Sequence, residues 1–178
     1  MNFLTARLEI RTISADDLDL YCQIYCDPVA MQFVAPAYDR AKAERCFAYA
    51  LRESGKSERN LCLMSIAWQS AGGKIGICGF QRLAHDGLVF EPGFMLLPGT
   101  QGLGVGTEVV AALCQALFCL PWQTNQATCQ TAATEIWLQY RADNVAADRL
   151  VKRLGYKVEY PKSATCSDAV MGRVILRR

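Results

Sequence analysis

The feature that most constrains this chain is a glycine-rich segment, residues 101–107, which follows an apolar stretch and precedes an apolar helical pattern. Its glycines stand at alternate positions, 102, 104 and 106. Glycines spaced in this way let a backbone approach a ligand closely and leave N–H groups pointing inward. The helix expected after them adds its positive N-terminal end, so the segment suits a phosphate or pyrophosphate. A turn that merely joins two elements is the alternative, and the segment alone leaves both interpretations open.

Hydrophobic periodicity predicts the elements of one α/β domain over residues 1–178. Alternation predicts a strand at 8–10, and apolar stripes with end signals predict helices at 14–27 and 40–53. Apolar runs separated by turn signals predict an antiparallel meander of strands at 61–68, 74–83 and 89–97. The later pattern predicts helices at 107–120 and 144–154 and strands at 134–140, 156–160 and 170–176, which together with the meander indicates a mixed sheet. The polar residues 121–133 lack periodicity, so we expect a surface loop or a substrate-side flap there.

Charge and cysteine usage exclude several classes of protein. The chain carries 19 basic and 17 acidic residues, and a net charge of +2 without a basic cluster is too balanced for the electrostatic footprint of a nucleic-acid or anionic-membrane binder, although a specific groove binder stays open as an alternative. No apolar run is long enough to span a bilayer, and the charges within residues 1–11 exclude a signal peptide. Nine cysteines without a CxxC pair, and a single histidine, His85, fit neither a disulfide framework nor a metal site. We therefore expect a cytoplasmic protein that binds no metal.

The two common nucleotide-binding loops do not fit the glycine-rich segment. A Walker loop requires Gly-Lys-Ser/Thr, whereas Gly106 is followed directly by Thr107. A dinucleotide-binding fingerprint requires a further glycine where Thr107 stands, and it usually opens a fold rather than following a meander. Neither class of nucleotide-binding loop therefore accounts well for this segment.

The remaining pattern, Gln-x-x-Gly-x-Gly after a strand that ends at 94–98, resembles the acyl-CoA signature of the GNAT N-acetyltransferases. Further segments resemble the RimJ/RimL-like branch of that family in order and spacing, namely residues 4–11, residues 27–31, residues 91–94 and the helix from Asn144 to Leu154-Gly155-Tyr156. The resemblance thus covers nearly the whole chain. It implies the GNAT fold, an α+β arrangement with a mixed, mostly antiparallel sheet, helices on both faces, and central strands that splay to bind acyl-CoA.

By this resemblance the co-substrate is acetyl-CoA, held by one strand and by the glycine-rich segment. The strand of Phe94, Met95 and Leu96 would splay from its neighbour, offer its free backbone groups to pantetheine, and polarise the thioester carbonyl with one N–H. Asn144 would lie near the pantetheine arm and help to fix the splay. The pyrophosphate would be surrounded by Gln101, Gly102, Leu103, Gly104, Val105, Gly106 and Thr107.

Acetyl transfer to an amine needs a base for the ammonium proton and a proton for the departing thiolate. Glu91 is the candidate base, acting through water, and the alternative is an exposed acid at a strand end. Relatives that donate the second proton carry tyrosine or serine at the positions held here by Val151 and Ala147, so no general acid is visible. Water, the amine's own proton, or a tyrosine from elsewhere, Tyr140 or Tyr156, would then serve.

Other residues carry weaker hypotheses. His85 lies within a His-Asp-Gly turn signal and is expected at the surface. Cys78 and Cys129 have no histidine nearby in the sequence, so neither suits a nucleophile. Residues between the first two predicted helices would either line the acceptor pocket or simply pack, namely Met31, Phe33 and Tyr38.

The sequence therefore predicts an enzyme that moves an acetyl group from acetyl-CoA to a primary amine. The acceptor stays open between a small amine, an aminoglycoside-like compound and a protein N-terminus. A strongly acidic pocket would favour polycations, but Glu44, Glu53, Glu58 and Asp86 do not cluster in the sequence. A non-catalytic acyl-CoA sensor of the same fold and a nucleotide-binding domain are the rival classes, and the protein is expected to be a monomer or homodimer.

Overall fold

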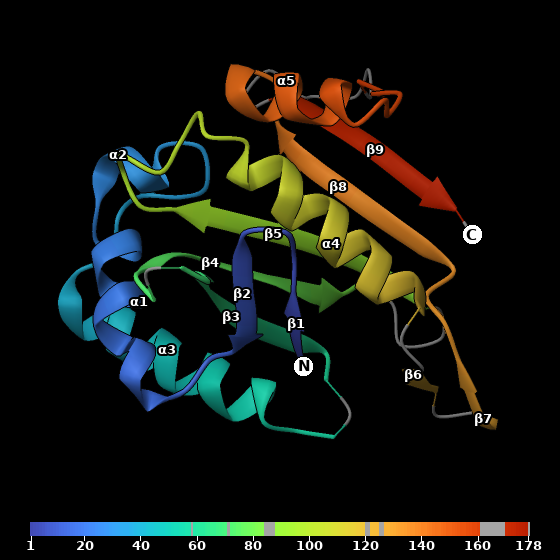
Figure 1. Cartoon of the computed structure of the whole chain (residues 1–178), viewed down its shortest axis with the longest axis horizontal. Coiled ribbons are helices and arrows are strands. Elements are labelled where there is room, and N and C mark those ends of the chain that lie inside the picture. The colour runs from blue at the N-terminus through green and yellow to red at the C-terminus, as the bar shows by residue number, and fades with distance from the viewer. Residues whose placement is uncertain are drawn as a thin grey trace.

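The structure is a computed structural model, and it describes residues 1–57, 59–70, 72–83, 88–119, 122–124, 127–160 and 170–177. A seven-stranded sheet runs in the order β1-β2-β3-β4-β5-β8-β9 (Figure 1). Its strands are β1 (Asn2–Leu4), β2 (Leu8–Thr12), β3 (Leu61–Trp68), β4 (Lys74–Arg82), β5 (Val89–Leu96), β8 (Glu135–Arg141) and β9 (Met171–Arg177). The helices are the 3₁₀ turn η1 (Ala15–Asp17), α1 (Leu18–Tyr25), α2 (Pro28–Met31), α3 (Arg40–Ser54), α4 (Val105–Cys119) and α5 (Val145–Arg153). A separate two-stranded sheet consists of β6 (Trp122–Thr124) and β7 (Ala127–Thr131).

The predicted mixed sheet is confirmed. β3, β4 and β5 form the antiparallel meander, with bounds that agree with the prediction to within one residue. Among the described strands of the large sheet, the pairing of β5 with β8 is parallel and the others are antiparallel. A parallel pair needs a crossover connection, and α4 supplies it. The glycine-rich segment therefore sits at the point where the chain leaves β5 and enters that crossover.

Helices cover both faces of the sheet, as predicted, so the protein has two apolar layers. On one face the side chains of α4 pack with those of β4, β5, β8 and α5. On the other face α1 and α3 pack over Ile77 and the partly buried Leu61, Leu63 and Met95. Alternate residues of one strand enter different layers because successive side chains of a strand point to opposite faces. Within the described residues, no helix is both long and apolar enough to cross a membrane.

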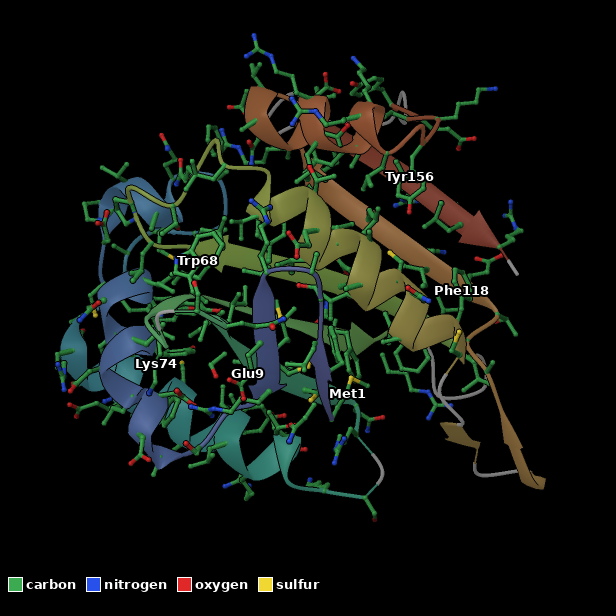
Figure 2. The ribbon with its side chains drawn as sticks, in the orientation of Figure 1. Met1, Glu9, Trp68, Lys74, Phe118 and Tyr156 are labelled. Atoms are coloured by element: carbon green, nitrogen blue, oxygen red, sulfur yellow. The ribbon has the colours of Figure 1, made fainter. Side chains whose placement is uncertain are left out.

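The predicted helix start at Ser14 has a capping arrangement that also ties η1 to the sheet. The Ser14 N–H donates to Asp17 Oδ2 at 2.8 Å, so the two residues form a capping box. Asp17 is fully buried and also accepts hydrogen bonds from Arg11, at 2.8 and 2.9 Å, and pairs with Lys74 at 2.7 Å. Figure 2 shows Lys74 reaching from β4 toward α1. One carboxylate thus holds β2, η1 and β4 together.

Two predicted elements differ from the structure. Residues 156–160 are not a strand, because they share only the isolated bridge between Glu159 and Arg173 with the sheet. Their alternating apolar residues, Tyr156 and Val158, instead pack against the core beside α5. The predicted loop at 121–133 contains the paired strands β6 and β7, which lie apart from the main sheet in Figure 1. The turn expected at His85 and the Cys129 side chain lie outside the described residues, as do Glu58 and Asp86.

Candidate functional site

The sheet opens between β5 and β8. The two strands pair only at Val89 with Glu135 and at Phe90 with Ile136, although both strands continue beyond these residues. Figure 1 shows them diverging toward their C-terminal ends. Pro92 supplies a local reason for the opening, because proline has no N–H with which to extend a hydrogen-bonded ladder. The predicted splay of the central strands is therefore present.

The splay leaves backbone groups of β5 directed into the gap. The Leu97 N–H donates to the Ile75 carbonyl at 2.8 Å, which fixes the phase of the antiparallel ladder with β4. In such a ladder the backbone groups of alternate residues point to opposite sides. The N–H and C=O of Phe94 and Leu96 therefore point toward the gap, whereas those of Met95 belong to the pairing with β4.

A cavity of about 380 Å³ passes through this gap. Its lining includes Tyr25, Leu61, Leu63, Ile77 and Met95 from the layer of α1 and α3. It also includes residues of the α4 and α5 layer, namely Cys78, Phe80, Phe94, Val110, Leu138, Tyr140, Ala147, Leu150 and Val151. An unbroken sheet would keep these two sets apart. The cavity thus passes through the gap in the sheet and contacts both apolar layers.

The predicted base, Glu91, lines this cavity at the point where the pairing of β5 with β8 ends. It is half-buried and points to the α1 and α3 side of the sheet, the same side as Met95, which lies four positions further along β5. The Gln81 amide donates to Glu91 Oε2 at 3.1 Å from the paired position on β4. The carboxylate is therefore positioned by a neighbouring strand and faces the passage.

The glycine-rich segment follows the C-terminal end of β5 and leads into α4. Gly102 and Gly104 both have φ of +78°, a left-handed conformation that favours glycine. Leu103 is exposed, whereas Val105 is buried in the core, so the segment turns from the surface into the helix. It does not line the described cavity, and it sits where the helix N-terminus presents its N–H groups.

The segment is held by the start of the chain. Arg7 donates to the Leu103 carbonyl at 2.9 Å and pairs with Glu108, in the first turn of α4, at 2.7 Å. The Thr5 hydroxyl donates to the same carboxylate at 2.6 Å. Burial opposes the ionisation of Glu108, but hydrogen bonds from Thr5 and Arg7 outweigh it and lower the pKa of Glu108. Arg7 and Glu108 are positioning residues that the motif did not reveal.

Asn144 lines the cavity and caps α5, since its Oδ1 accepts the Ala147 N–H at 3.1 Å. One and two turns further, Ala147 and Val151 also line the cavity. The positions at which relatives would carry a proton donor therefore present methyl groups to the passage.

Neither tyrosine considered as a substitute donor is poised for that role. Tyr140 lines the cavity, but its hydroxyl donates to Asp148 at 3.1 Å, and burial together with this bond raises the pKa of Tyr140. Hydrogen bonds, the largest from Lys152, lower the pKa of Asp148 to about 2, so the acceptor stays ionised. Tyr156 is not among the lining residues, and Figure 2 shows it beside β9.

The α1 and α3 side of the cavity contains aromatic residues, and the sequence analysis had named only some of them. Of the residues expected either to line the pocket or to pack, Phe33 lines the cavity and Met31 is fully buried. Tyr38 does not line it but stacks on Tyr25, which does, at 5.7 Å between ring centroids. The spacing of Tyr21 and Tyr25, one helical turn apart, was the available signal for this wall. Burial raises the pKa of the Cys78 thiol, so the cavity holds no ready thiolate there.

A glycine-rich helix start beside a splayed strand pair defines a GNAT-type fold. The model of the acetyltransferase (GNAT) domain matches residues 7–157. The chain belongs to this family. No curated protein sequence matches it.

Solved structures of low sequence identity share this fold. A GNAT-family acetyltransferase from Bacillus anthracis has a TM-score of 0.78 at 13% identity, with coverage of 99% of this chain and 98% of that one. The ribosomal L7/L12 alpha-N-protein acetyltransferase RimL, in complex with coenzyme A, has a TM-score of 0.75 at 12% identity, with coverage of 99% and 98%. Spermidine N-acetyltransferase from Vibrio cholerae, in complex with CoA and spermine, has a TM-score of 0.72 at 13% identity, with coverage of 96% and 95%.

Proposed function

We propose that this protein is an acetyl-CoA-dependent N-acetyltransferase that transfers the acetyl group directly to a primary amine. The observation that carries the proposal is the passage through the sheet, with unpaired β5 backbone along it and Glu91 at its α1 and α3 side. A passage of this kind lets an acyl donor and an amine approach from opposite faces. Structural neighbours that are named as acetyltransferases and bind CoA support the donor, and the RimJ/RimL-like resemblance of the motifs supports the branch.

The residues around the gap fit acetyl-CoA. Phe94 and Leu96 direct backbone donors and acceptors into the gap, where the amide groups of pantetheine could pair with them, and Met95 and Asn144 line it. The positive φ of Gly102 and Gly104 and the N-terminus of α4 suit a pyrophosphate. We assign the remaining positions of the segment to the same role, namely Gln101, Leu103, Val105, Gly106 and Thr107.

In this proposal acetyl-CoA supplies a reactive acyl thioester, and the chain's own groups orient it and move protons. Glu91 accepts the proton of the acceptor's ammonium group, which frees the amine to attack. A β5 backbone N–H, from Phe94 or Leu96, stabilises negative charge on the carbonyl oxygen. Because the side chains of Val151 and Ala147 have no ionisable proton, water or the amine's own proton protonates the departing CoA thiolate.

Those two apolar positions also favour a second candidate, a protein that binds acyl-CoA as a sensor without transferring the acyl group. Both candidates use the same cofactor residues and differ in whether Glu91 matters for turnover. The cytoplasmic location expected from the sequence is part of the proposal. All seven cysteines whose side chains the structure describes are free, which supports a reducing compartment.

Thermal unfolding with single ligands tests the cofactor assignment. Acetyl-CoA at a hundredfold excess over its dissociation constant should stabilise the protein by about 2.7 kcal/mol, which raises Tm by several degrees. CoA should also protect, and ATP and NAD should not. Protection by ATP or NAD alone would contradict the proposal together with all its site residues.

A substitution at Gly106 tests whether the start of α4 shapes the gap. A Cβ at Gly106 would lie 2.7 Å from Phe94 Cζ and 2.9 Å from Leu150 Cδ1, so Gly106→Ala forces the Phe94 ring to move. We expect acetyl-CoA affinity to fall by about tenfold, as measured by titration calorimetry. The control is Gly55→Ala, where a Cβ meets only carbonyl oxygens at 3.6 Å. Equal affinities in the two variants would show that the Phe94 ring does not shape the cofactor site.

A further inference from the structure

The α1 and α3 side of the cavity is an apolar chamber with few polar groups. We define this acceptor chamber by residues of the cavity lining that belong to or face that side. Its apolar and aromatic members are Tyr25, Phe33, Val34, Leu61 and Leu63. Its polar members are Gln81, Glu91, Gln139 and Arg141. Among the described residues that line the cavity, Glu91 is the one carboxylate.

Among the described residues that line the chamber, the one cation, Arg141, is already neutralised. Arg141 donates to both carboxylate oxygens of Asp143, at 3.0 and 2.6 Å. Its guanidinium also lies 5.9 Å from the centre of the Phe33 ring. Within the part of the chain that the structure describes, the chamber therefore offers one negative charge without a cationic partner, on Glu91, with amides and apolar surface around it.

Acidic residues on the neighbouring helices are occupied elsewhere. Arg40 contacts Asp19 at 3.2 Å and Glu44 at 2.8 Å. Asp27 and Asp39 accept backbone N–H groups as caps of α2 and α3. None of these four carboxylates lines the cavity. The described elements around the chamber thus hold no second carboxylate that faces a bound cation.

The aromatic wall of the chamber is rigidly built. Tyr25 stacks on Tyr21 at 4.0 Å with an interplanar angle of 14°, and on Tyr38 from another direction at 5.7 Å. Tyr21 in turn contacts Phe47 of α3 at 5.4 Å. A wall that is packed before the ligand arrives loses little conformational entropy on binding, so it suits a flat or extended apolar group.

We infer that the acceptor is a small primary monoamine with an uncharged, apolar alkyl or aryl body, rather than a polyamine, an aminoglycoside or a peptide. This inference rests on the proposed acetyl transfer. One ammonium group meets one carboxylate, Glu91, and the apolar body contacts the chamber wall, where burial of apolar surface is favourable. A second ammonium group on the same molecule would lose its hydration on binding and would find no second carboxylate in the chamber, which is strongly unfavourable.

A matched pair of amines tests the inference. Hexylamine and hexamethylenediamine have the same carbon chain and differ in one terminal ammonium group. With acetyl-CoA as donor and thiol release as readout, kcat/KM for hexylamine should exceed that for hexamethylenediamine by at least about tenfold. A peptide with a free N-terminus, assayed in parallel, should be a poorer acceptor than hexylamine.

A carboxylate added to the chamber wall should reverse the preference. Val34 lines the cavity and is 62% exposed, so Val34→Asp is compatible with folding. It should shift the ratio of kcat/KM toward the diamine by about tenfold, because the second ammonium gains a partner. Val29→Asp is the matched control, since Val29 lies on α2, is 65% exposed and does not line the cavity. Its ratio should equal that of the unmodified protein.

The outcomes separate this inference from the proposed function. Equal or faster acetylation of the diamine or the peptide would overturn the monoamine class while leaving the acetyltransferase proposal intact. A Val34→Asp ratio equal to that of Val29→Asp would place the acceptor outside the chamber and overturn the inference too. If neither amine causes thiol release although acetyl-CoA protects the protein against unfolding, the monoamine class is refuted. The acyl-CoA sensor then becomes the better candidate function. No protection by acetyl-CoA would refute the proposed function itself.

Discussion

Glu91→Gln should reduce kcat/KM for amine acetylation by about a hundredfold or more, within the range that general bases contribute. The amide keeps the size of the side chain and its place opposite Gln81, but it accepts no proton from the acceptor's ammonium group. The pH dependence of turnover should therefore flatten, because the group that takes up the proton is gone. Acetyl-CoA affinity should stay nearly unchanged, since the cofactor contacts proposed here come from the β5 backbone and the glycine-rich segment.

Glu9→Gln is the matched control for this prediction, because Glu9 is an exposed acid on β2 and does not line the cavity. It should turn over like the unmodified protein at every pH. If Glu91→Gln does the same, Glu91 is not the base. If both variants and the parent bind acetyl-CoA and none transfers its acetyl group, the sensor becomes the better description of the protein.

Asp17→Ala should destabilise the protein by about 3 kcal/mol, the lower end of the range for removing one partner of a buried ion pair. The substitution leaves Arg11 and Lys74, both drawn inward to this carboxylate, without their partner. The lower end applies because the two side chains are 31% and 33% exposed and regain some hydration. The measurement is denaturant unfolding at neutral pH. Asp16→Ala, at an exposed neighbouring position, should change stability by less than about 0.5 kcal/mol.

The pH dependence of stability gives this prediction a second readout. Burial disfavours the charged form of Asp17, but the hydrogen bonds from Arg11 and Lys74 outweigh it, so the pKa of Asp17 is lowered in the folded protein. A lowered pKa contributes stability above the unfolded value, which is lost as pH falls through the folded value. The difference between the parent and Asp17→Ala should therefore shrink on acidification. A difference that stays constant with pH would mean that the carboxylate's charge contributes nothing.

The sequence predicted the sheet and its long helices because each rests on a local pattern, whereas the splay was expected only from the resemblance to the GNAT family. The meander follows from apolar runs between turn signals. The strand expected at 156–160 failed because alternation is equally compatible with a coil whose Tyr156 and Val158 pack under a helix. Periodicity reports which side chains are buried and cannot report which backbone groups are paired.

The acceptor chamber could not be predicted from local sequence patterns because its residues come from distant segments of the chain. Tyr25, Leu61 and Arg141 come from three different elements and meet only in the folded chain. Local patterns left open whether Phe33 and Met31 line a pocket or simply pack, and the structure places Phe33 on the cavity wall and Met31 in the core. The charge inventory of the chamber likewise depends on contacts such as that of Arg141 with Asp143, which only the structure supplies.

The anchoring of the glycine-rich segment has a consequence for the order of assembly. The bonds from Thr5 and Arg7 to Glu108 join residues 103 and 101 positions apart, and the bond from Arg7 to Leu103 spans 96. Contacts of such separation form late, because a long stretch of chain must first be brought together. During synthesis the amino-terminal residues emerge well before α4 exists. A nascent chain that ends before α4 contains the whole meander but lacks Glu108. Thr5 and Arg7 can therefore form their hydrogen bonds to this residue only after the first turn of α4 has been synthesised.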